Sequence, residues 1–231
     1  MADPAAQAAL QPVRVWDLPT RLFHWALAVC VVASFVTGHI GGNALAWHMR
    51  SGYTIFTLLA FRILWGLVGG RWSRFASFVY SPGSVLRYLR RQSRPEEHHE
   101  VGHSPLGALS VFALIVILVA QVGTGLFADD EIATTGPLNR FVASATGLAL
   151  TAWHKGAGQW GIVLLVSLHL AAILWYRVGR GIDLVRPMLT GDKALPEAVP
   201  ASVDGVAARV LAAVLIGLCA AGVAWLVGLG G

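Results

Sequence analysis

Five long apolar runs constrain the fold of this chain more than any other feature of its sequence. They cover residues 22–38, 47–69, 106–127, 153–176 and 206–229, and more polar segments separate them. Each run is close to the length of about 20 residues that an α-helix needs to cross the hydrocarbon core of a bilayer. Only 13% of the 231 residues are charged, whereas soluble domains carry about 25%. The sequence therefore predicts an all-α fold, an integral membrane helical bundle.

The positions of Lys and Arg predict how these helices are oriented. Basic residues gather before the first run, between the second and third, and after the fourth, in segments 13–21, 71–94 and 177–209. Segment 39–46 has no Lys or Arg, and segment 128–152 has only Arg140. Because basic loops stay on the cytoplasmic side, we expect a cytoplasmic N-terminus and a periplasmic C-terminus. The same placement explains the net charge of +5 without a nucleic-acid partner.

The runs also suggest a domain organisation. Residues 13–193 hold four runs and are predicted to form one four-helix domain, preceded by a tail (1–12) and followed by a linker (194–205) and a fifth transmembrane helix (206–231). Segment 81–94 is typical of a short amphipathic helix on the inner membrane surface. The small residues Gly217, Ala221 and Gly222 fit a homo-oligomer contact, or else a lipid-facing filler helix. Cys30 and Cys219 lie inside apolar runs and are expected to pack in the core.

The fourth run carries two histidines in an otherwise apolar stretch. His154 and His169 are fifteen residues apart, which in an α-helix gives about 22 Å along the axis and about 60° in azimuth. With the predicted orientation, His24 lies level with His169 on the inner side and His48 lies level with His154 on the outer side. Any one of them alone could hydrogen-bond a neighbouring helix or serve a proton path. Two pairs matched in depth favour a metal or cofactor instead.

Imidazole suits iron, and haem iron accepts axial histidine on both faces. Two bis-histidine haems stacked about 20 Å apart could carry electrons across the membrane. Gly156, Gly158 and Gly161 are interpreted as room for a large planar group. Arg62 lies fourteen residues after His48 and is predicted to pair with a propionate of the inner haem, the alternative being an arginine that reaches the membrane surface.

Other basic residues lie near the outer pair. Arg50 and Lys155 are predicted to bind the outer haem in the same way, or else to anchor the chain at the interface.

The residues around these histidines resemble those of the bacterial membrane cytochromes b, a group that includes cytochrome b561 and the b-type subunits of nickel-iron hydrogenases. The similar segments are V-R-V-W-D-L-P-T-R-L-F-H-W at 13–25, H-M-R-S-G at 48–52, F-R-I-L-W-G at 61–66, G-H-S-P-L-G at 102–107, W-H at 153–154 with His169, and L-T-G-D-K at 189–193. The resemblance covers residues 13–193 and implies two haem b groups, with His24, His48, His154 and His169 as their ligands. The fifth helix departs from this four-helix pattern.

Together these features predict electron transfer between a periplasmic redox partner and the quinone pool of a bacterial inner membrane. The partner could be a c-type cytochrome, a hydrogenase or a small oxidant, and the chain would act as an electron-transfer subunit or a quinone-linked oxidoreductase. The alternative is a proton or metal-ion transporter lined by histidines. Such a path would have few polar side chains, since Gln159 and Ser167 are its main polar groups between His154 and His169. A pure membrane anchor would have no use for four matched histidines.

Overall fold

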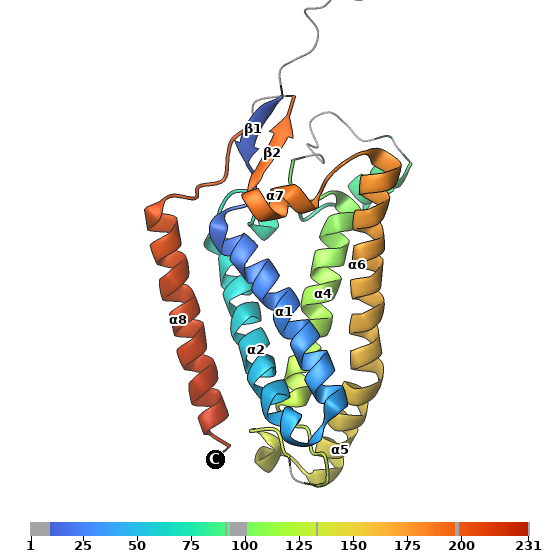
Figure 1. The fold of residues 1–231 in the computed structure, drawn as a ribbon, viewed down its shortest axis with the longest axis vertical. Helices are drawn as coiled ribbons and strands as arrows, with labels where there is room; N and C mark the ends of the chain where they lie inside the picture. Colours follow the sequence, from blue (N-terminus) through green and yellow to red (C-terminus); the bar gives the residue numbers. More distant parts are fainter. Residues whose placement is uncertain (1–9, 91, 93–100, 133, 197–198, 231) are drawn as a thin grey trace, which may run out of the picture. The chain divides into compact units, whose positions relative to one another are not determined.

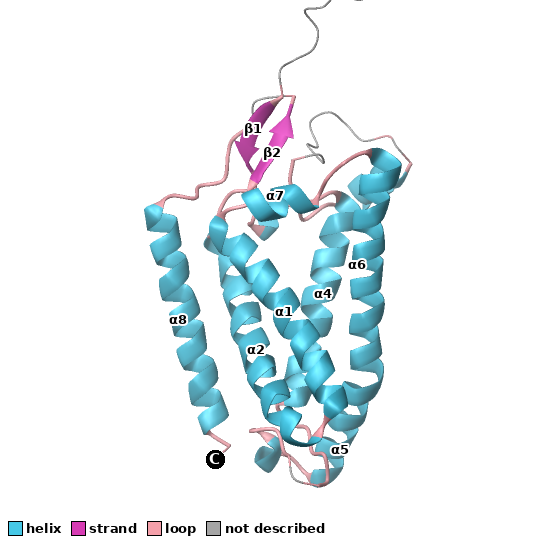
Figure 2. Ribbon diagram, in the orientation of Figure 1, coloured by secondary structure: helices cyan, strands magenta, loops and turns pink. Residues whose placement is uncertain are grey.

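A computed structural model describes residues 10–90, 92, 101–132, 134–196 and 199–230 of the chain. Five long helices correspond to the five apolar runs: α1 (Leu18–Ile40), α2 (Leu45–Val68), α4 (Pro105–Gly125), α6 (Gln159–Arg180) and α8 (Val206–Gly228). Shorter elements are α3 (Pro82–Leu89), α5 (Ser144–Trp153), α7 (Val185–Thr190) and the strands β1 (Gln11–Arg14) and β2 (Asp192–Leu195). Figures 1 and 2 show these elements. The predicted all-α membrane fold is confirmed.

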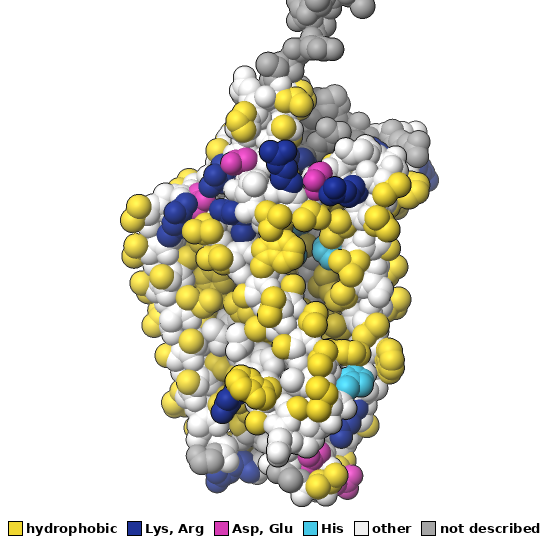
Figure 3. All heavy atoms as spheres, viewed as in Figure 1, with side chains coloured by type: hydrophobic (Ala, Val, Ile, Leu, Met, Phe, Trp, Pro, Cys, Tyr) yellow, Lys and Arg dark blue, Asp and Glu magenta, His cyan; other side chains and the backbone are white. Residues whose placement is uncertain are grey.

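The surface of these helices is suited to lipid. Among the described residues, five helical segments are long and apolar enough to cross a membrane. Large apolar side chains point outward along them, for example Val178 at 78% and Trp225 at 69% exposure. Figure 3 shows hydrophobic side chains over the exposed flanks of the helices. Because soluble monomers rarely expose apolar patches on this scale, the chain is a multi-pass membrane protein.

The chain divides into two compact units, and the division cuts through all five long helices. The first unit comprises Met1–Arg21, Trp65–Leu109 and Ala172–Ala212. The second comprises Leu22–Leu64, Ser110–Ala171 and Ala213–Gly231.

The first unit joins segments that lie far apart in the sequence. Its strands β1 and β2 pair antiparallel, with Gln11 opposite Leu195 and Arg14 opposite Asp192. A small apolar core lies beside them, made of Val13, Val15, Trp16, Val101 and Leu195. Lys, Arg, Asp and Glu side chains gather around the strands, α7 and the start of α8 (Figure 3). The unit therefore ties the start of the chain to the segment that follows α6.

A buried carboxylate fixes the start of α1 within this unit. Asp17 is fully buried, and its Oδ1 caps the helix by accepting a hydrogen bond from the Thr20 N–H at 2.8 Å. Oδ1 also accepts from Trp65 Nε1 at 3.1 Å. Oδ2 accepts from the Gly70 N–H at 3.1 Å and from Ser73 Oγ at 2.7 Å. Four donors thus compensate the loss of water around one carboxylate and connect α1 to the end of α2.

The second unit contains the packed membrane core. Ile55 and Leu59 of α2 and Leu118 of α4 are buried together. Partly buried residues of α1, α4 and α6 pack against them, and these are Leu27, Cys30, Val31, Ile117, Val122 and Ile162. Cys30 therefore lies among packing residues as expected, and Cys219 is likewise a free thiol.

Several expectations about the segments between the helices need correction. Residues 144–152, between the third and fourth apolar runs, are helical, because α5 covers them and continues through a π-helical turn (His154–Gly158) into α6. The strands include Gln11 and Pro12 from the expected tail, and Ala194 and Leu195 from the expected linker. The predicted amphipathic helix is present as α3, with Ser81 as its N-cap and Pro82 in its first turn, while residues 91 and 93–94 lie outside the described part of the chain.

Candidate functional site

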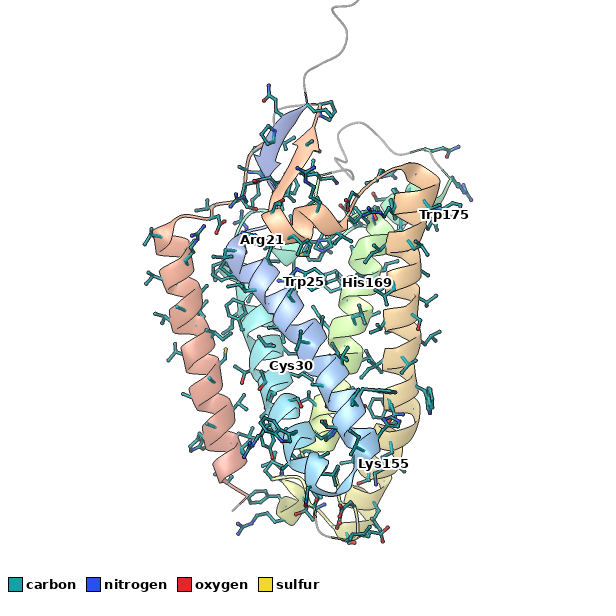
Figure 4. The ribbon with its side chains drawn as sticks, in the orientation of Figure 1. Arg21, Trp25, Cys30, Lys155, His169 and Trp175 are labelled. Atoms are coloured by element: carbon teal, nitrogen blue, oxygen red, sulfur yellow. The ribbon has the colours of Figure 1, made fainter. Side chains whose placement is uncertain are left out.

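The structure brings the four predicted histidines together as two pairs, both within the second unit. The rings of His24 on α1 and His169 on α6 have centroids 6.4 Å apart and an interplanar angle of 52°. Figure 4 shows His169 turned from α6 toward α1, on the side where Trp25 lies. The Trp25 ring meets His24 edge-on at 5.1 Å. This is the first pair.

The second pair joins His48, near the start of α2, to His154, the first residue of the π turn. Their ring centroids lie 5.9 Å apart, with an interplanar angle of 84°. Both pairings follow the expectation from matched depth.

The spacing within each pair fits two axial ligands of one iron ion. Imidazoles that bind a metal from opposite sides, each through a nitrogen about 2.0 Å away, have ring centroids about 6 Å apart. The measured separations of 6.4 Å and 5.9 Å agree with this value. Each pair supplies two donors, which suits an iron whose other four ligands come from a porphyrin. The described residues contain no group of three or more His, Cys, Asp or Glu able to hold a metal.

His48 is held in one orientation by α1. Its Nδ1 lies 2.9 Å from the carbonyl oxygen of Ser34 and 3.2 Å from the Ser34 hydroxyl. The ring packs closely against Gly38, one helical turn further along, where a Cβ atom would come within 2.9 Å of Nδ1. The absence of a side chain at Gly38 therefore lets the imidazole reach the helix backbone.

His154 is held in the same way by α4. Its Nδ1 lies 2.9 Å from the carbonyl oxygen of Gln121 and 3.3 Å from the hydroxyl of Thr124. Gly125 packs against the His154 ring as Gly38 packs against the His48 ring. A Cβ atom at Gly125 would come within 2.9 Å of His154 Cε1. Two helices thus present the same arrangement, a carbonyl and then a glycine four residues later.

These contacts determine which ring nitrogen can bind a metal. A carbonyl oxygen only accepts, so Nδ1 of His48 and of His154 carries the proton and donates. Nε2 is then the nitrogen with the free electron pair. Metal-binding histidines in proteins usually have this arrangement, in which the second ring nitrogen donates to a backbone carbonyl or carboxylate. In both rings of the second pair, Nε2 is therefore the nitrogen that could bind a metal.

The backbone of His154 in the π turn is also bonded to α4. Gln121 Nε2, on α4, donates to the His154 carbonyl oxygen at 3.0 Å. Gly158 lies against the side chains of Gln121 and Trp153, and a Cβ atom there would clash with both. Gly158 was interpreted as room for a planar group, but it accommodates these two side chains instead. Gly161 likewise faces Ile117, whereas Gly156 faces open space.

A cavity of about 200 Å³ adjoins the second pair. Its walls come from α1, α2, α4 and α6 and include both histidines of the pair, with Gly52, Tyr53 and Lys155. Apolar side chains supply most of the remaining walls, as expected for a pocket that holds a planar apolar group by a few polar contacts.

The first pair has different surroundings. His24 Nδ1 is buried and has no hydrogen-bond partner among the described residues. Arg62, on α2 in the same unit, is only 3% exposed. A buried guanidinium in a membrane helix needs an anion or several acceptors nearby. This burial bears on both roles considered from the sequence for Arg62, a propionate partner and an arginine that reaches the membrane surface.

Arg50 lies in another environment. It is exposed, and its guanidinium carbon lies 4.9 Å from the centroid of the Trp47 ring. This stacking is typical of an interface anchor.

Sequence reasoning missed the contacts that orient the second pair. Gln121 and Thr124 are polar residues within the third apolar run, and polar residues inside a membrane segment were the available signal. Ser34, Gly38 and Gly125 carried no comparable signal because small residues are common in membrane helices.

A family model and individual relatives both match this chain, and both are b-type membrane cytochromes. The model of the family described as prokaryotic cytochrome b561 matches residues 15–191. The chain is 23% identical over 211 residues to the probable Ni/Fe-hydrogenase 1 B-type cytochrome subunit of Escherichia coli strain K12, covering 77% of this chain and 88% of that protein. It is 26% identical over 220 residues to the probable Ni/Fe-hydrogenase B-type cytochrome subunit of Cupriavidus necator, covering 81% and 89%. No solved structure matches the chain.

Proposed function

Because this chain belongs to the prokaryotic cytochrome b561 family, we propose that it carries electrons across the membrane through two haem b groups, each held by one histidine pair. Membrane electron transfer and haem b follow from the family and its b-type cytochrome relatives. The number of haems, their ligands and the redox partners are the proposed part.

One observation carries the proposal: four histidines from three helices form two pairs at axial-ligand separation. His24 with His169 would hold one haem, and His48 with His154 the other. When bound, haem would supply a one-electron iron couple at the pair that holds it. The chain's own residues orient the ligands, exclude water with apolar walls and hold the sites at different depths.

The buried Arg62 is proposed to compensate a haem propionate at the first pair. Lys155, which lines the cavity at the second pair, is proposed to do the same there. Arg50 stays a weaker candidate because its guanidinium stacks on Trp47.

The partners follow from the relatives and from charge placement. The relatives are named as hydrogenase cytochrome subunits, so a hydrogenase is the first candidate donor, with a c-type cytochrome as the second. The basic segments 71–94 and 177–209 support a cytoplasmic N-terminus and a periplasmic C-terminus. Electrons would then pass between a periplasmic protein and the quinone pool of the bacterial inner membrane.

Haem counting tests the ligand assignment. The purified chain should contain two haem b per polypeptide by pyridine haemochrome absorbance. His24→Ala or His169→Ala should each remove one haem, and His48→Ala or His154→Ala should each remove the other. His39→Ala is the matched control, because this exposed histidine contacts Gln159 and belongs to neither pair. Full haem content in His154→Ala and His169→Ala would refute the assignment.

A reconstitution experiment tests the partners. A reduced quinone analogue added to the protein in liposomes should reduce the haem iron, which absorbance detects. A hydrogenase or c-type cytochrome on the outside should exchange electrons with the haem. Reduction by the protein partner alone, with no response to quinol, would contradict the quinone part of the proposal.

A further inference from the structure

A second pocket lies in the first unit, at the end of α2. Its volume is about 370 Å³. The lining residues that matter here are Trp65, Val68, Arg71, Arg74, Val203 and Leu211. It thus combines apolar walls with two cationic side chains.

The two arginines are available to a ligand. Neither Arg71 nor Arg74 makes an ion pair with any described residue. Arg71 lies over the ring of Trp72, with its guanidinium carbon 5.7 Å from the ring centroid. Both side chains are exposed. Two guanidiniums at one pocket attract an anion, and their planar geometry suits the paired oxygens of a phosphate.

The pocket lies where a membrane helix meets the headgroup region. The membrane-spanning segment of α2 ends at Val68, and that of α8 begins at Val206. Val68 is 56% and Leu211 43% exposed. A ligand in this pocket can therefore place an anionic group on the arginines and an apolar chain along the helices. Basic pockets between membrane helices are suited to anionic lipid headgroups.

We propose that this pocket binds an anionic phospholipid, with its phosphate on Arg71 and Arg74 and an acyl chain along Val68 and Leu211. Free phosphate shares the headgroup chemistry but would leave the apolar walls uncovered. The pocket shares no lining residue with either histidine pair.

The walls of the pocket are held in place by named contacts. Trp72 Nε1 donates to the carbonyl oxygen of Pro200 at 2.8 Å, and the Trp72 N–H donates to Ser202 Oγ at 3.2 Å. Ser202 Oγ in turn donates to the carbonyl oxygen of Val15 at 2.7 Å. The pocket is therefore formed before a ligand arrives, which reduces the ordering cost of binding.

The family match ends before one wall of the pocket begins. The family model covers residues 15–191, whereas the wall from Pro200 to Leu211 lies beyond it. The site is thus built jointly by the family domain and by the added fifth helix. A bound lipid would attach that helix to the domain.

Native mass spectrometry of the haem-loaded protein in a neutral detergent tests the proposal. Phosphatidylglycerol should give a one-lipid adduct at lower concentration than phosphatidylcholine, and it should raise the unfolding temperature where inorganic phosphate does not. Arg71→Gln with Arg74→Gln should weaken phosphatidylglycerol binding about tenfold or more. The matched control is Arg90→Gln with Arg186→Gln, which removes the same charge outside the pocket and should leave binding unchanged.

A variant that keeps both arginines separates lipid binding from loss of folding. Ala208 lines the pocket, so Ala208→Phe should fill the apolar part and displace the lipid while the haem spectrum stays unchanged. Equal binding of the two lipids, equal stabilisation by inorganic phosphate, or unchanged phosphatidylglycerol binding in Ala208→Phe would each overturn the proposal.

Discussion

His154 and Gln121 hold each other through two reciprocal hydrogen bonds across α4 and the π turn. The His154 ring donates from Nδ1 to the Gln121 carbonyl oxygen at 2.9 Å, and the Gln121 amide donates to the His154 carbonyl oxygen at 3.0 Å. One bond sets the tautomer of the His154 ring, and the other gives the His154 carbonyl oxygen a side-chain donor. Glutamine at this depth in a membrane helix is thereby explained.

Replacing Gln121 with Leu should therefore weaken haem binding at the second pair. The backbone carbonyl remains, but the His154 carbonyl loses its donor and the turn loses its support. Changes to residues that orient a metal ligand typically cost about 10–100-fold in metal affinity. Haem loss to apomyoglobin, followed by absorbance, should become faster for one haem and stay unchanged for the other. Gln159→Leu, which changes the other glutamine that lines this cavity, is the control.

The glycines behind the histidines lead to a second prediction. Gly125→Ala would place a Cβ atom 2.9 Å from His154 Cε1, and Gly38→Ala would do the same at His48 Nδ1. Either change should push the ring off its carbonyl and remove most of the haem from the second pair. Gly123→Ala is a matched control on α4, since no atom lies within 4 Å of a Cβ there. Equal haem content in Gly123→Ala and Gly125→Ala would contradict this account.

The helices and the histidine pairs could be predicted from the sequence. The length of an apolar run predicts a membrane helix, and the position of a histidine in that run predicts its depth in the bilayer. An apolar run of about 20 residues has few alternatives to a membrane helix. Histidines at the same depth on different helices can then meet. The angle of about 60° calculated for His154 and His169 assumed an uninterrupted α-helix. A π turn rotates less per residue, and both histidines nevertheless pair with their expected partners.

Contacts between distant segments could not be predicted in the same way. The strand pair of β1 with β2 joins residues almost 180 positions apart, for example Arg14 and Asp192, and each strand has only four residues. Asp17 gave no sign of its role either, because its donors come from Trp65, Gly70 and Ser73 as well as from its own turn. Such contacts depend on the tertiary fold and leave no periodic pattern.

The buried Arg62 predicts a shift in redox potential. A cation beside a haem stabilises the reduced form, which carries one positive charge less than the oxidised form. Arg62→Gln should therefore lower the midpoint potential of the haem at the first pair and leave the other potential unchanged. Potentiometric titration with optical detection measures both. Arg50→Gln removes an exposed arginine of the same helix and should change the first potential little, whereas an unchanged potential in Arg62→Gln would refute the propionate pairing.

The Asp17 cap predicts a loss of stability that is not specific to the haems. Asp17→Asn replaces one acceptor oxygen by an amide that faces donors, so at least one buried hydrogen bond becomes a repulsive contact. We expect a loss of about 3 kcal/mol in the free energy of unfolding. Thermal unfolding in detergent, followed by loss of helical circular dichroism, should show a lower midpoint. Asp183→Asn is the control, because this exposed carboxylate can be replaced by another good capping side chain.

The ion pairs of the first unit predict a loss of stability in acid. The hydrogen bond from Arg14, at 2.6 Å, lowers the pKa of Asp192 below its ordinary value. Burial alone would raise the pKa of Asp204, but hydrogen bonds from Arg209, the Leu18 N–H and Arg14 together lower it. A carboxylate whose pKa is lowered by folding stabilises the protein above its unfolded pKa of about 3.9. That contribution is lost as the pH falls through the folded value.

The stability that these two carboxylates contribute should therefore be constant above about pH 5 and be lost below about pH 4. Asp192→Asn with Asp204→Asn should lower stability at pH 6 and make its acid dependence shallower, because no carboxylate is left there to protonate. Glu131→Gln, which removes a carboxylate that makes no ion pair with a described residue, should leave the curve unchanged. The measurement is the thermal midpoint at each pH. An equally steep decline in the double variant would show that the acid-sensitive carboxylates lie elsewhere.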